Sequence, residues 1–152
     1  MRHLRFLGHG IFAVMLVVGI VSLATASPAM AVSKYARITI HKAECPANTT
    51  GNIFNKCHDN KLGGVAFTVV NPTGHGTTRL TDSNGVAKWG PRAGRNAIYE
   101  SAADFNAYGA AYVYCKDQNT NYVFIDGQIT TRSVVLWTSP GAVIICDWYN
   151  LT

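Results

Sequence analysis

Hydrophobic and polar residues alternate in short runs along most of the chain after residue 32. Alternation with a period of two is typical of strands that bury one face. The run at 36–42 is a clear example, because Ile38 and Ile40 are separated by polar residues. Turn-forming residues separate the runs, and Asp82-Ser83-Asn84-Gly85 is a strong hairpin signal. The pattern predicts strands at 36–42, 64–70, 77–81, 86–89, 96–101, 108–115, 122–125, 133–137 and 143–150.

Short strands at this spacing predict an all-β fold. Seven to nine such strands, with no long segment of helical periodicity, favour an antiparallel Greek-key β-sandwich. The one long irregular segment, residues 45–61, is polar and rich in asparagine, so we expect a loop there. We expect a single β-sandwich domain over residues 32–152, large enough for a modest core.

The N-terminal segment has a different pattern. A basic start precedes an apolar run over residues 11–26, and small residues ending in Ala31 follow it. This order is that of a secretory signal peptide. A transmembrane anchor would need about 20 apolar residues, and the run is shorter. We therefore predict a signal peptide over residues 1–31, cleaved after Ala31 or alternatively after Ala26, and a secreted, extracellular protein. Association with the cell surface stays open.

Net charge and motif content narrow the classes of partner. The whole chain carries a formal charge of +5, and two arginines leave with the signal, so the mature charge is about +3. Nucleic-acid-binding proteins usually carry a strongly basic stripe. The basic cluster around one predicted hairpin is better explained as a solvated surface: Arg79, Lys88, Arg92 and Arg95. We expect no nucleic acid, no membrane contact after cleavage, no cofactor and no metal, since there is no C-x-x-C motif and the histidines are scattered.

Four cysteines follow the signal: Cys45, Cys57, Cys115 and Cys146. An even number in an exported chain favours disulfides. Of the three pairings, spacing favours Cys45–Cys57, which closes the polar loop, and Cys115–Cys146, which joins the last strand to an earlier strand or its following loop. In the chain-entropy model these bonds are worth roughly 3 and 3.5 kcal/mol. A redox or nucleophilic thiol is the alternative, but no pair has a redox spacing.

Five segments, taken in order, resemble a known family: 38–42, 62–69, 80–86, 94–100 and 146–150. The family is that of the prealbumin-like B-type modules of Gram-positive collagen adhesins, pilins and other surface proteins, here in a disulfide-containing variant. The usual Pro-Gly-Tyr run after Glu100 is replaced by residues 101–109. In many such modules a lysine on the first strand forms an isopeptide bond with an asparagine near the end of the last strand, and a glutamate assists. The resemblance assigns these roles to Lys42, Asn150 and Glu100.

Side-chain parity bears on these three residues independently of the family. Each shares a strand face with apolar neighbours: Lys42 with Ile38 and Ile40, Glu100 with Ile98, and Asn150 with Trp148 and Ile144. A desolvated lysine becomes an amine nucleophile more readily, and a desolvated glutamate can stay protonated and donate to the asparagine carbonyl. Alternatively, a one-residue slip would turn Lys42 to solvent, and Glu100 and Asn150 could lie at exposed or frayed strand ends.

These observations favour a secreted, non-catalytic structural or adhesive module of the cell-envelope kind. We expect a monomer or weak oligomer, and an unidentified surface or matrix ligand. The alternative is a soluble ligand-binding protein, such as a carbohydrate binder or enzyme inhibitor, which uses exposed aromatic residues. The candidates are Tyr108, Tyr112, Tyr114, Tyr122, Trp137 and Trp148. A hydrolase is the third class, without a nucleophile or metal motif to mark it; its candidate residues are His75, Asp82, Glu100 and Asp104.

Overall fold

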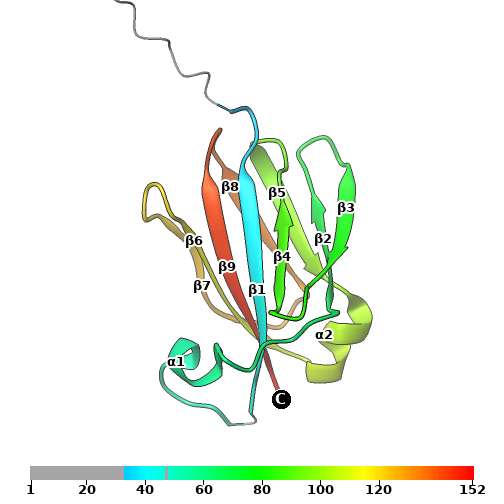
Figure 1. The fold of residues 1–152 in the computed structure, drawn as a ribbon, viewed down its shortest axis with the longest axis vertical. Helices are drawn as coiled ribbons and strands as arrows, with labels where there is room; N and C mark the ends of the chain where they lie inside the picture. Colours follow the sequence, from blue (N-terminus) through cyan, green and yellow to red (C-terminus); the bar gives the residue numbers. More distant parts are fainter. Residues whose placement is uncertain (1–32, 47) are drawn as a thin grey trace, which may run out of the picture. The chain divides into compact units, whose positions relative to one another are not determined.

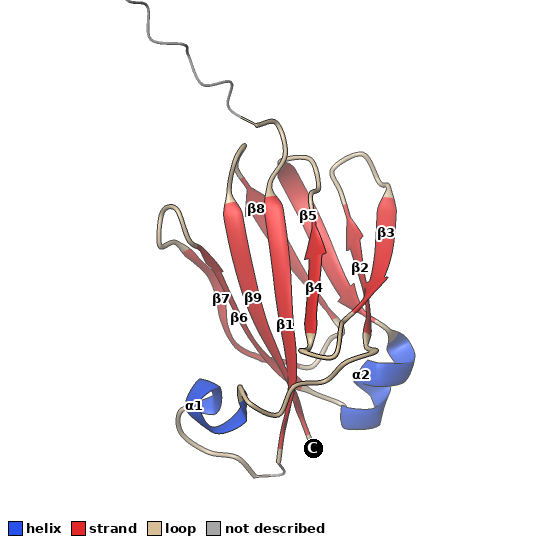
Figure 2. Ribbon diagram, in the orientation of Figure 1, coloured by secondary structure: helices blue, strands red, loops and turns tan. Residues whose placement is uncertain are grey.

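The computed structural model describes residues 33–46 and 48–152, which form two β-sheets and two short helices (Figures 1 and 2). One sheet has the strand order β4 (Val86–Trp89), β1 (Arg37–Cys45), β9 (Val143–Leu151), β6 (Ala111–Asp117) and β7 (Val123–Ile129). The other has the order β3 (Gly76–Leu80), β2 (Ala66–Val70), β5 (Gly94–Glu100) and β8 (Ser133–Thr138). The predicted β-sandwich is confirmed. The predicted signal peptide lies outside the described residues.

Strand pairing departs from the expected antiparallel pattern at one place. The first and last strands, β1 and β9, are parallel neighbours over their whole length, while every other pairing between the described strands is antiparallel. Parallel neighbours need a long crossover connection. Here the rest of the described domain supplies it, which the local alternation of β1 and β9 could not reveal. The first and last strands of the domain therefore lie side by side in one sheet (Figure 1).

Two short helices were not predicted. Helix α1 (Ile53–Cys57) lies inside the expected loop and is capped by Asn52, whose side chain accepts from the backbone N–H of Asn55. Helix α2 (Ala102–Tyr108) follows Glu100, so β6 begins at Ala111 and not at Tyr108. Each helix has fewer than three turns, too few to produce a helical period. Both lie at the same end of the sandwich (Figure 2).

The predicted end of a strand at residue 125 is wrong, because β7 continues through Asp126 and Gly127 to Ile129. Gly127 pairs with Val113 in the β6–β7 ladder. The Asp126 carboxylate accepts a hydrogen bond from the Tyr112 hydroxyl on the neighbouring strand. Cross-strand contacts thus override the turn preference of this dipeptide.

The space between the sheets is filled by apolar side chains from both, among them Ile38, Ile40, Phe67, Ile98, Leu136, Ile144 and Trp148. Both predicted disulfides are present. Cys115 and Cys146 face each other directly in the β6–β9 ladder, so their bond is a cross-strand one. Cys45–Cys57 ties α1 to the end of β1. No helix in the described part of the chain is long and apolar enough to cross a membrane.

Candidate functional site

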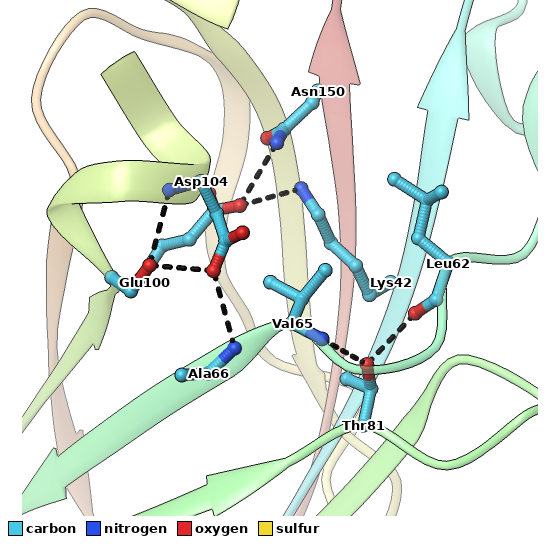
Figure 3. Close-up of polar contacts among 9 residues, drawn as sticks. Lys42, Leu62, Val65, Ala66, Thr81, Glu100, Asp104 and Asn150 are labelled. Atoms are coloured by element: carbon cyan, nitrogen blue, oxygen red, sulfur yellow. Dashed lines mark hydrogen bonds and ion pairs between the residues drawn. The ribbon is translucent and has the colours of Figure 1, made fainter. Parts of the chain in front are cut away.

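Three polar side chains meet in the interior, close to the end of the sandwich that carries α2 (Figure 3). Lys42 comes from β1 and Asn150 from β9, which are neighbours in one sheet. Glu100 is the last residue of β5, in the facing sheet. The strand alternation predicted that each of these residues shares a face with apolar side chains, and in the structure that face lies between the sheets. None is exposed by more than 1%.

One carboxylate oxygen of Glu100 contacts both other residues. Its Oε1 lies 3.1 Å from the Lys42 Nζ and accepts a hydrogen bond of 2.9 Å from the Asn150 Nδ2. The amine is close to the carboxylate but makes no well-directed hydrogen bond to any described group. Glu100 thus holds the amine and the amide next to each other, as Figure 3 shows.

Two further polar atoms of this site are buried without a partner among the described residues: Oε2 of Glu100 and Oδ1 of Asn150. Such atoms are costly, because burial removes their hydrogen bonds to water. The contact expected from the sequence was a Glu100 proton donated to the Asn150 carbonyl, whereas here the amide nitrogen donates to the carboxylate. A half-turn of the amide about Cβ–Cγ would place Oδ1 beside Glu100 and allow the expected contact.

Burial also changes the charge state of the lysine. It lowers the pKa of Lys42 from 10.5 to about 8, although the nearby Glu100 charge and the weaker fields of Asp104 and Glu44 act in the opposite direction. A substantial share of this amine is therefore neutral near pH 8, and a neutral amine is a nucleophile. The arrangement brings an activated amine, a carboxyl group and an amide into a site without water contact.

Backbone contacts fix the position of Lys42. The Lys42 N–H donates to the Gly85 carbonyl at 2.7 Å, and its carbonyl accepts from the Leu62 N–H at 3.0 Å. Thr81 holds the segment that follows, since its hydroxyl donates to the Leu62 carbonyl and accepts from the Val65 N–H. Sequence reasoning did not assign a role to Gly85 or Thr81, although both lie in the hairpin that it recognised.

The hydrolase candidates do not form a common site. The Asp82 carboxylate accepts from the backbone N–H groups of Asn84 and Val86 and so organises the β-hairpin. His75 is exposed. Asp104 lies near Glu100 but is bound to Ser101 and Ala66. The four basic residues Arg79, Lys88, Arg92 and Arg95 are all exposed, as a solvated surface would be.

The six aromatic candidates differ in burial, and three of them are half-buried: Tyr108, Tyr112 and Tyr114. Trp148 is fully buried and packs edge-on against Phe67. Trp137 and Tyr122, in contrast, are 70% and 62% exposed. These two line one groove, between the outer strands β7 and β8 of the two sheets, together with Asp117, Thr120, Phe124, Val135 and Ser139. The groove therefore contains an exposed aromatic surface beside hydroxyl groups.

No family model matches the chain, and no curated protein matches it significantly. Among solved structures, it is similar to the major pilin subunit BcpA of Bacillus cereus, with 16% identity and a TM-score of 0.42 over 77% of this chain and 30% of that one. The major pilin from Streptococcus pyogenes is 12% identical, with a TM-score of 0.38 over 78% of this chain and 48% of that one. The Bacillus anthracis TIE protein is 12% identical, with a TM-score of 0.30 over 75% of this chain and 33% of that one.

The chain is similar in structure to these two pilin subunits, at 16% and 12% sequence identity. The match spans about a third to a half of the length of these solved structures.

Proposed function

We propose that this protein is a secreted, non-catalytic module of the cell envelope, whose first and last strands are joined by an isopeptide bond between Lys42 and Asn150. The observation that carries the proposal is the shared contact of both side chains with one buried carboxylate oxygen of Glu100. Burying an amine, a carboxyl and an amide together is costly unless the groups neutralise or react. A single intramolecular reaction would remove the charged pair altogether.

The reaction needs no external reagent. The neutral Lys42 Nζ attacks the Cγ of Asn150, and the new Nζ–Cγ bond replaces the Cγ–Nδ2 bond. One amine proton passes through the Glu100 carboxyl to the leaving nitrogen, which departs as ammonia. Glu100 acts as the acid and base in this transfer, and the fixed positions of the two strands supply proximity. The bond forms once, without turnover.

The mechanical consequence supports an envelope role. Force that reaches the domain through the chain before β1 and after β9 would pass from Lys42 directly to Asn150. All residues between them, including both disulfide-closed loops, would lie outside the loaded path. Such a module resists extension and proteolysis, which suits a protein exposed to shear outside the cell.

Intact mass tests the proposal. The protein, fully reduced so that disulfides do not contribute, should be lighter than its sequence by one ammonia. Digestion should yield one branched peptide that joins the segments containing Lys42 and Asn150. The variant K42R should have the full sequence mass, whereas K61R, which changes a lysine exposed in the structure, should still lose ammonia. Full mass in the unmodified protein would refute the bond.

A second candidate function is the binding of a neutral saccharide in the groove between β7 and β8. The observation that favours it is the pairing of the exposed Trp137 and Tyr122 with the hydroxyl-bearing Ser139 along one groove. Aromatic rings with an apolar face and an accessible hydroxyl suit the C–H faces and hydroxyls of sugars. The Asp117 carboxylate is already engaged by Asn119, Thr120 and Val143, so the groove favours an uncharged ligand.

Binding to a glycan array, followed by calorimetry with the best glycan, tests this second function. W137A and Y122A should each weaken binding at least tenfold. L80A, which removes an exposed apolar residue from the opposite edge strand β3, should leave binding unchanged. Equal loss in all three variants, or no glycan bound, would exclude the groove.

A further inference from the structure

The helix that replaces the family's usual run after Glu100 is anchored by one side chain. Asp104 lies in the first turn of α2 and accepts, through Oδ2, from the Ser101 hydroxyl at 2.5 Å and from the Ala66 N–H at 3.3 Å. The Asp104 N–H in turn donates to the Ser101 hydroxyl oxygen. Ser101 is therefore the N-cap of α2, and its hydroxyl binds both the backbone N–H and the carboxylate of Asp104. Through Ala66, the Asp104 carboxylate also contacts a second strand.

The second strand is β2, which starts at Ala66. Both backbone groups of Ala66 bind residues just after Glu100, because its carbonyl accepts from the Ser101 N–H at 2.8 Å and its N–H donates to Asp104. The β2–β5 ladder ends at the pair Phe67–Glu100. Asp104 therefore extends the ladder by one contact beyond Glu100, at the place where a strand end would otherwise fray.

The same segment also reaches the lysine. Residues 62–66 run from Leu62, whose N–H donates to the Lys42 carbonyl, to Ala66, which binds Ser101 and Asp104. Figure 3 shows the contact between Asp104 and Ala66 beside the Lys42–Glu100–Asn150 cluster. The backbone spacing between Lys42 and Glu100 is thus set by one five-residue segment, and Asp104 holds one end of it.

Asp104 acts on the site through its charge as well. Its carboxylate raises the pKa of Lys42, as Glu100 does more strongly and Glu44 does more weakly. Tyr108, on the same helix, lies in the field of the same three carboxylates. From β9 the lysine is faced by Asn150 and Trp148, which do not titrate. Asp104 is therefore a source of negative charge that can be removed without touching the three reacting residues.

We infer that Asp104 is a positioning residue for the isopeptide reaction, which holds Glu100 in place over Lys42 and Asn150 and sets the pH range in which the reaction proceeds. The inference rests on the proposed function, since it requires the Lys42–Asn150 bond. The inference is nevertheless distinct from the proposed function, because the Lys42–Asn150 bond could form without any contribution from Asp104. A purely structural helix cap would affect stability but not the pH dependence of the reaction.

The experiment follows the loss of ammonia during refolding. Full-length chain is recovered unfolded from inclusion bodies, refolded under oxidising conditions between pH 5 and pH 9, and quenched in acid at intervals for intact mass. D104A removes both hydrogen bonds and the charge, whereas D104N keeps an oxygen that accepts from Ala66 but removes the charge. D59N, which neutralises an exposed carboxylate on the surface, is the matched control.

The expected results differ between the variants. D104A should slow ammonia loss roughly tenfold or more at every pH, because a small displacement of Glu100 weakens proximity. D104N should react at a rate close to that of the unmodified chain at its optimum. In the plot of its reaction rate against pH, the rising limb should move to lower pH, because loss of the negative charge favours the neutral form of the Lys42 amine. D59N should match the unmodified chain in both respects.

The remaining outcomes each decide the matter. An unmodified chain that never loses ammonia refutes the proposed function and the inference with it. A chain that loses ammonia while D104A keeps the normal rate refutes the inference alone. Equal slowing of D104A and D104N without a shift in pH assigns Asp104 to folding only and also overturns it. If D104A does not fold, as judged by circular dichroism, the pH shift of D104N decides.

Discussion

Lys42 and Asn150 are diagonal neighbours across the parallel pair of β1 and β9, because Lys42 lies in register with Trp148 and Asn150 with Glu44. Residues two apart on a strand share a face, so both side chains enter the space between the sheets. A diagonal pair is farther apart than a direct one but within reach of a long side chain. The lysine stem therefore spans the step, and Glu100 from the facing sheet contacts both ends.

This relationship predicts how the domain responds to force. In the protein without substitutions, which carries the proposed crosslink, a pull on both ends of the chain should not extend the residues between Lys42 and Asn150. In N150A the same pull should unfold the sandwich and release roughly 3.5 Å per freed residue. Single-molecule force spectroscopy, under oxidising conditions, measures the difference.

The disulfides provide an internal control for the force experiment. In N150A, the residues inside the Cys45–Cys57 and Cys115–Cys146 loops should stay closed until a reductant is added, and then extend. The unmodified protein should gain no extension on reduction. A full-length extension of the unmodified protein would mean that the load passes through the sandwich and that no crosslink is present.

Without the crosslink, the buried lysine should make stability depend on pH. The pKa of Lys42 falls from 10.5 in the unfolded chain to about 8 in the folded one. Between these values the unfolded state binds the extra proton, so the free energy of unfolding rises with pH. In N150A we expect a gain of up to about 3 kcal/mol from this residue between pH 7 and pH 10.5. Urea denaturation at a series of pH values measures it.

The matched control removes both ionisable groups of the site. The triple variant K42M/E100Q/N150A should lack the rise, because neither position 42 nor position 100 can titrate. A rise of equal size in both variants would assign the pH dependence to residues elsewhere. The protein without substitutions, which carries the crosslink, should resemble the triple variant, since an amide nitrogen neither gains nor loses a proton in this pH range.

The close approach of a hairpin to Lys42 gives a third prediction. Gly85 has φ +71°, and a Cβ added there would lie 2.3 Å from the Lys42 carbonyl oxygen. G85A must therefore displace either the hairpin or the backbone of Lys42, in addition to the strain of a positive φ. We expect it to destabilise the fold by about 2–4 kcal/mol and to slow the loss of ammonia.

Gly74 supplies the comparison for G85A. It has a similar φ of +83°, but a Cβ there would meet nothing within 4 Å. G74A should therefore show the backbone strain alone, at about 1 kcal/mol, and leave ammonia loss unchanged. Equal effects of the two substitutions in urea denaturation and intact mass would show that the contact with Lys42 has no consequence.

The strands could be predicted from the sequence because they alternate, and the parity of Ile38, Ile40 and Lys42 depends on nothing beyond one strand. The helices could not, because α1 and α2 have five and seven residues and are defined by their caps. Ser101-x-x-Asp104 matches the sequence signature of a helix start and could have indicated α2. In the sequence alone, residues 101–109 stand out only as a departure from the family.

The site was predictable as a set of residues but not as a geometry. Parity placed Lys42, Glu100 and Asn150 on apolar faces, yet it does not say which strands are neighbours. The parallel pairing of β1 with β9 depends on the path of the whole domain, which local patterns do not contain. For the same reason, the contacts of Asp104 with Ala66 and of Gly85 with Lys42 join segments far apart in sequence and leave no local signal.

The two disulfides should contribute unequally to stability. Cys115 and Cys146 are fully buried in the main core and close the longer loop, whereas Cys45 and Cys57 belong to a small separate cluster beside α1. Loop entropy alone gives about 3.5 kcal/mol for the first bond and about 3 kcal/mol for the second. The loss of sulfur packing in the core should widen the difference. C115A/C146A should therefore be less stable than C45A/C57A in urea denaturation, by about 1–2 kcal/mol. Reduction of the protein without substitutions leaves the sulfur atoms in place and so separates loop entropy from sulfur packing.

If C115A/C146A instead cost the same as C45A/C57A or less, the β6–β9 bond would not be the more important of the two for stability.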